Sequence, residues 1–138
     1  MRIKREYTNA SVKKTDLFYP ELSFKLIGAA FDVYNKLGWG YQENIYQKAY
    51  ALTLNDLGIK FEKEKFVAIT FNNKNIGRVF LDFVVENTIV VEMKIMPKLG
   101  YIHINQVVSY LKNVNLKLAI LIYFLKDGVR YRRIINSN

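Results

Sequence analysis

Apolar positions in the first part of the chain recur at the spacing of an α-helix. From Pro20, which suits a first helical turn, apolar residues return every three or four positions as far as Leu37 and Gly38. A second helical pattern follows the glycine-rich break at residues 38–40 and is closed by Gly58. The sequence therefore predicts two consecutive helices separated by a short loop.

The period changes to alternation after these helices. Residues 60–71 and 76–85 have the composition of strands, and the polar segment 72–75 between them is typical of a turn. A tight turn at 86–88 leads into a further strand at 89–95. We therefore expect three consecutive strands in this part of the chain.

The last part of the chain contains one helical pattern and two strand patterns. Helical spacing returns at residues 102–112, and residues 117–124 form a continuous apolar run, typical of a strand covered on both faces. A turn at 126–128 leads into an alternating strand at 129–136, which we expect at a sheet edge. The order predicts one α/β domain, with a mixed β-sheet of about five strands flanked by α-helices.

Composition limits the chemistry that this domain can perform. The 138 residues fit one compact domain, and they include no cysteine and a single histidine, His103. Disulfides, thiolate nucleophiles, cysteine zinc sites and multi-histidine metal sites are therefore excluded. A bound metal must be held by oxygen, which favours a hard cation such as Mg²⁺ or Mn²⁺.

The charge of the chain favours an anionic partner. The formal net charge of +9 suits nucleic acid or an anionic membrane surface, although an A/T-rich coding bias would also enrich lysine. Residues 1–18 carry five cations without apolar periodicity, so we expect a basic arm before a domain at 19–138. No segment resembles a secretory signal or a membrane helix, and we expect a cytoplasmic protein.

A charge pair interrupts the strand predicted at 89–95. Glu92 and Lys94 are two positions apart and therefore point to the same face. If 86–88 is a three-residue hairpin loop, Asp82 lies opposite Glu92, whereas a two-residue loop would turn Asp82 to the other face. Facing carboxylates about 5 Å apart repel unless a cation or proton lies between them. A divalent metal would neutralise the two carboxylates and leave Lys94 as a donor to phosphate.

Alternation alone favours a simpler interpretation, in which the three charged side chains occupy an ordinary solvated face. The same face of the predicted strands, however, also carries Phe80, Val84 and Val90. This mixture of apolar and charged residues indicates a partly covered pocket.

Asp82 followed by Glu92-Met93-Lys94 on the next strand resembles the PD-(D/E)xK nuclease superfamily. The chain is most similar to the GxxExxY family, a small bacterial and archaeal branch of it, and the resemblance runs from about residue 21 to 135. The defining spacing is supplied by the segment GYQENIY, with Gly40, Glu43 and Tyr46.

A later block supports the same resemblance. The segment HINQVVSYLK provides His103, Gln106 and Tyr110, similar to the H-x-x-Q and Q-x-x-x-Y of the family. Two positions depart from the pattern: Leu81 precedes Asp82 in place of the proline that names the superfamily, and Trp39 stands where relatives have proline.

The resemblance implies a restriction-endonuclease-like fold and a metal-dependent nuclease that uses Mg²⁺, with Mn²⁺ as a substitute. The implied substrate is nucleic acid, with DNA as the first expectation. It implies metal ligation by two strand carboxylates and, directly or through water, by a helix carboxylate, with a lysine assisting the attacking water. The helix after the third strand would position the site or the substrate. The implied residues are Asp82, Glu92 and Glu43 for the metal, Lys94 and Gln106 for catalysis, and Tyr110, His103 and Tyr46 for support.

Other roles and functions compete with these. Glu43 also suits a helix N-terminus, and a lone histidine or a motif tyrosine is more often structural. The same fold without useful catalysis would be a nucleic-acid or partner-binding module. A membrane-docking function is disfavoured because this chain has no basic amphipathic helix. A serine hydrolase is disfavoured because Ser109 does not lie in a strand-to-helix elbow. Because no recognition module is evident, a homodimer or a protein partner would supply specificity.

Overall fold

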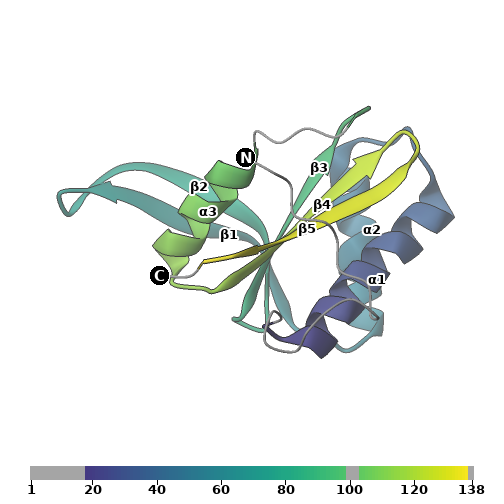
Figure 1. Ribbon diagram of the computed structural model, residues 1–138, viewed down its shortest axis with the longest axis horizontal. Helices are drawn as coiled ribbons and strands as arrows, with labels where there is room; N and C mark the ends of the chain where they lie inside the picture. The colour runs from purple at the N-terminus through teal and green to yellow at the C-terminus, as the bar shows by residue number, and fades with distance from the viewer. Residues whose placement is uncertain (1–17, 99–102, 137–138) are drawn as a thin grey trace.

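The computed structural model describes residues 18–98 and 103–136, which form three helices and five strands in the predicted order (Figure 1). Of the predicted basic arm at 1–18, all but the last residue lies outside the described residues. No helix in the described ranges is long and apolar enough to cross a membrane. The elements are α1 (Pro20–Leu37), α2 (Glu43–Asp56), β1 (Phe61–Phe71), β2 (Lys74–Val85), β3 (Ile89–Ile95), α3 (His103–Val114), β4 (Leu118–Leu125) and β5 (Gly128–Ile135).

The five strands form one mixed sheet in the order β1-β2-β3-β4-β5. Neighbouring strands are antiparallel except β3 and β4, which run parallel because α3 connects them. Every residue of β4 is buried, and β5 lies at an edge, as the sequence predicts. The predicted α/β fold with a mixed five-stranded sheet is confirmed.

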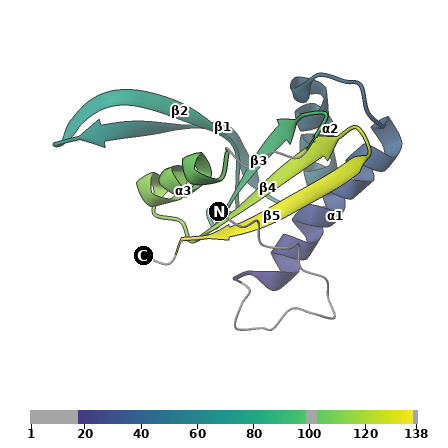
Figure 2. The ribbon, with the colours of Figure 1, turned by 45° about the horizontal axis from the view of Figure 1, so that its top comes forward.

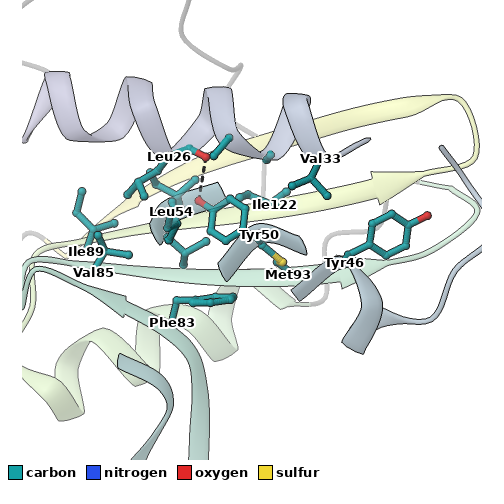
Figure 3. Close-up of a cluster of buried hydrophobic side chains, with 14 of the residues drawn as sticks. Leu26, Val33, Tyr46, Tyr50, Leu54, Phe83, Val85, Ile89, Met93 and Ile122 are labelled. Atoms are coloured by element: carbon teal, nitrogen blue, oxygen red, sulfur yellow. Dashed lines mark hydrogen bonds between the residues drawn. The ribbon is translucent and has the colours of Figure 1, made fainter. Parts of the chain in front are cut away.

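Helices cover both faces of the sheet and create two apolar cores. On one face α1 and α2 pack together, and the Tyr50 hydroxyl donates a hydrogen bond to the Leu26 carbonyl oxygen at 2.8 Å (Figure 3). On the other face, α3 packs against β4 and against the outer part of β1 (Figure 2). The side chains of Ile104, Val107 and Leu111 form the buried stripe of α3.

The β1–β2 hairpin is longer than the sheet that it joins. β2 pairs with β3 only from Phe83 to Val85, whereas β1 and β2 stay paired out to the Asn72-Asn73 turn. The rest of the hairpin projects from the molecule as a two-stranded ribbon (Figures 1 and 2). β2 therefore leaves β3 at Asp82, and the two strands form a fork there.

The tip of this hairpin is tighter than the predicted turn at 72–75. Asn72 and Asn73 both have positive φ, at 50° and 63°, and β2 already begins at Lys74. Asparagine tolerates this left-handed conformation well, which makes a two-residue connection between long strands possible.

Candidate active site at the β2–β3 fork

Two carboxylates lie where β2 and β3 separate. The Val85–Ile89 pair confirms the predicted register, but the backbone ladder stops at Phe83. Beyond it, the Asp82 amide donates to Oε2 of Glu92 at 2.9 Å, and the Met93 amide donates to Oδ2 of Asp82 at 2.8 Å. Each carboxylate thus accepts a bond from the opposite strand, and this exchange fixes both side chains at the fork.

Glu92 is buried with only 4% of its surface exposed, so the solvated-face interpretation is wrong for this residue. Burial, followed by the charge and the side-chain hydrogen bond of Asp82, raises the pKa of Glu92 to about 9. Lys94 opposes this shift only in part. At neutral pH and without a cation, Glu92 therefore holds a proton beside the Asp82 carboxylate.

Charges at this carboxylate pair act on ionisable side chains of both helical layers. Burial and the charge of Asp82 raise the pKa of Glu43 at the start of α2, and Lys94 lowers it. On α3, burial raises the pKa of the Tyr110 hydroxyl, with smaller contributions from Glu92 and Asp82. Ionisable side chains of α2, β2, β3 and α3 therefore influence one another's pKa values at the fork.

Glu43 is positioned by a residue that the sequence analysis did not single out. The Gln47 side-chain amide Nε2 donates a hydrogen bond to Oε2 of Glu43 at 3.2 Å, and Gln47 is buried. The two residues lie four positions apart on α2, where side chains of a helix face each other. The four-residue spacing from Glu43 was the signal in the sequence that could have identified Gln47. The hydrogen bond makes Gln47 a positioning residue for Glu43.

Tyr46, the last residue of the GxxExxY spacing, is fully buried and anchors the loop before α2. Its hydroxyl donates to the carbonyl oxygen of Gly38 at 2.5 Å, and its ring stacks on Phe124 with centroids 4.7 Å apart. Gly40 has a φ of 121°, which explains the glycine of the motif. Tyr46 therefore packs in the core and holds the loop before α2.

Of the three α3 residues predicted for the site, Tyr110 is connected to the carboxylates by its electrostatics. Tyr110 is half-buried and responds to the charges of the fork. Gln106 lies one helical turn earlier and is exposed. The side chain of His103 lies outside the described part of the chain.

The donor set at the fork fits a hard divalent cation. Within residues 18–98 and 103–136, no three His, Cys, Asp or Glu side chains converge as a preformed metal cage. Asp82 and Glu92, however, are close enough to share a hydrogen bond, and each uses only one oxygen to accept a backbone amide. Oδ1 of Asp82 and Oε1 of Glu92 remain as hard oxygen donors, and a cation would replace the proton between them.

In a comparison with protein families, residues 20–134 match the PD-(D/E)XK nuclease superfamily. The chain belongs to the PD-(D/E)XK nuclease superfamily. The match spans the sheet, all three helices and the fork. Among solved structures, this PD-(D/E)XK domain is similar to one described as "Crystal structure of SSO0001", with 15% identity over 90% of this chain and 80% of that chain and a TM-score of 0.47. No curated protein matches the chain.

Proposed function

We propose that this PD-(D/E)XK protein is a Mg²⁺-dependent nuclease that hydrolyses phosphodiester bonds in DNA, and that it belongs to the GxxExxY branch. The observation that carries the proposal is the buried Glu92 beside the half-buried Asp82 at the fork, with the charge of Lys94 acting on Glu92. Burying the Glu92 carboxyl group beside a second carboxyl group costs free energy, and a protein that only binds nucleic acid gains nothing from this arrangement.

In this proposal, Asp82 and Glu92 hold the cation directly. Glu43 contributes through a water molecule, because the three carboxylates do not converge as one metal-binding group. Gln47 keeps the Glu43 carboxylate in place through its hydrogen bond. When bound, the divalent cation neutralises charge on the phosphate and favours ionisation of a water molecule.

Two further side chains act on the substrate. Lys94 orients the attacking water and stabilises the negative charge that develops on the phosphate. The raised pKa of Tyr110 keeps its hydroxyl protonated at neutral pH, so this group can donate a hydrogen bond to a phosphate oxygen. Gln106, which is exposed, would contribute only by contacting the substrate itself.

A second candidate is a nucleic-acid-binding module with little catalysis. It is favoured by the absence of a three-ligand cage within the described ranges. It differs from the nuclease in needing neither a cation nor Lys94 as a catalytic residue.

The test is cleavage of plasmid, linear duplex and single-stranded substrates by purified protein in Mg²⁺, Mn²⁺ or EDTA. We expect cleavage only with a cation, and we expect Lys94→Ala to lower its rate by at least ~100-fold. Lys94→Arg should not restore the rate, because a guanidinium does not release a proton near neutral pH. Lys25→Ala, which removes an exposed cation on α1, is the matched control and should cleave normally. An unchanged rate in Lys94→Ala would contradict the nuclease and favour the binding module.

A further inference from the structure

We call the projecting part of the β1–β2 hairpin, residues 66–80, the arm. Its base has one face packed and one face open, whereas residues 70–78 are exposed on both faces. Val67 and Val79 face α3 and belong to the core beneath it. Phe66 and Phe80 lie opposite each other in the ladder and point to the other face, where 48% and 54% of their surfaces are exposed. Their rings are edge-to-face, with centroids 5.9 Å apart. The open face thus presents a pair of aromatic rings to the surroundings.

The charge of the arm favours a phosphate-bearing occupant for this face. Residues 66–80 include Lys74 and Arg78 but no aspartate or glutamate. Arg78 pairs with Ala68 and lies two positions from Phe80, so it shares the open face with the rings. A second copy of the chain would bring the same cations into contact and repel, whereas a nucleic-acid strand supplies both phosphates and flat bases.

The rings also lie close to the carboxylates along the chain. Phe80 precedes Asp82 by two positions on β2, which corresponds to about 6.6–6.8 Å along a strand. The hairpin changes faces at the fork, so the rings and Glu92 lie on opposite faces. β2 has no β3 partner beyond Phe83, and a nucleic-acid strand stacked on Phe80 would bring its next phosphate to the carboxylates around this open edge.

We infer that Phe66 and Phe80 form a stacking platform for unpaired bases, and that the site acts on single-stranded or locally unpaired nucleic acid. The inference rests on the proposed nuclease function and adds its substrate class. In a duplex each base is already stacked on both faces, so only an unpaired base offers a free face to these rings. Arg78 would hold the accompanying backbone through a charge-assisted contact to phosphate.

The test measures the affinity of the full-length protein for a single-stranded oligonucleotide and for a duplex of the same sequence, by fluorescence anisotropy in EDTA. The double variant Phe66→Ala/Phe80→Ala should lose at least ~10-fold in affinity for the single strand and less than ~2-fold for the duplex. Phe24→Ala removes a phenylalanine on α1 that is 61% exposed, and this matched control should change neither affinity. Phe80→Tyr keeps the ring and should keep the single-strand affinity.

Folding and self-association are controlled in the same series. Phe66→Leu/Phe80→Leu keeps the apolar bulk of the arm. If this variant has the melting temperature of the wild type and still loses single-strand affinity, the loss also supports stacking. Unchanged single-strand affinity in the folded variants, or an equal loss for duplex, would overturn the platform and leave the nuclease proposal standing. A wild-type dimer that dissociates in the variants, measured by sedimentation, would overturn it in favour of an interface. Wild-type protein that neither binds nor cleaves any substrate would overturn both proposals.

Discussion

On the α1–α2 side of β3, Val91 and Met93 are fully buried among apolar side chains. On the α3 side of the same strand, Glu92 is buried beside Asp82, and Lys94 is half-buried. The first face gains free energy from removing apolar surface from water, with little dependence on pH or ions. The second face loses free energy unless a proton or a cation compensates its carboxylates. One strand thus separates the residues that hold the fold together from those proposed to perform chemistry.

The largest change in stability should come from a substitution on the apolar face. Met93→Ala removes a fully buried side chain and leaves a cavity, so the free energy of unfolding should fall by ~2–5 kcal/mol in a denaturant titration. Leu52→Ala, on the outer side of α2 at 66% exposure, is the control and should change stability by less than ~0.5 kcal/mol. A loss below ~1 kcal/mol in Met93→Ala would mean that this face is not close-packed.

A smaller change in stability, a gain in place of a loss, should come from a substitution on the polar face. The folded chain keeps a proton on Glu92 up to a pKa of about 9, whereas the unfolded chain releases it near the ordinary value of 4.5. The folded state therefore binds more protons between these values, and its stability is full below pH ~4.5 and falls as pH rises toward 9.

Glu92→Gln should remove this pH dependence because its neutral amide needs no proton. At pH 8 and in EDTA, the variant should be more stable than wild type by ~1–3 kcal/mol, and thermal melts between pH 5 and 9 would measure the difference. A wild-type melting temperature that rises steadily over this range, with the same slope in Glu92→Gln, would contradict a buried, protonated Glu92.

The smallest change in stability is expected at the loop before α2. Tyr46→Phe keeps the ring on Phe124 but deletes the hydrogen bond to the Gly38 carbonyl oxygen, so stability should fall by ~0.5–1.5 kcal/mol. Cleavage by the folded variant should persist if Tyr46 only packs. A large loss of cleavage at unchanged stability would instead assign Tyr46 to the reaction.

The sequence predicted the elements well because apolar periodicity reports burial directly. The loop length at 86–88 also predicted the register that places Asp82 opposite Glu92. It did not predict that the ladder would stop there, with the two carboxylates accepting backbone amides in its place. That exchange depends on side-chain geometry, which a pairing rule does not contain.

Strict alternation also failed at the fork. It placed Leu81 and Phe83 on one face, but Leu81 packs beneath α3 and Phe83 packs against α2. Across from this point, Glu64 has a φ of 58°, and β1 and β2 are not paired between Glu64 and Asp82. The hairpin therefore changes faces at the fork, because a local backbone distortion interrupts the two-residue period of the strand.

The most direct test of the cation site is calorimetric titration of Mn²⁺ into the wild-type protein at pH 7, in two buffers with different ionisation enthalpies. If the cation replaces the proton on Glu92, binding should saturate and release about one proton per cation, which the difference in heat between the buffers measures. Asp82→Asn should abolish this binding while the protein remains folded. No binding at millimolar Mn²⁺, or binding that is unaltered in Asp82→Asn, would contradict a metal site at the β2–β3 fork.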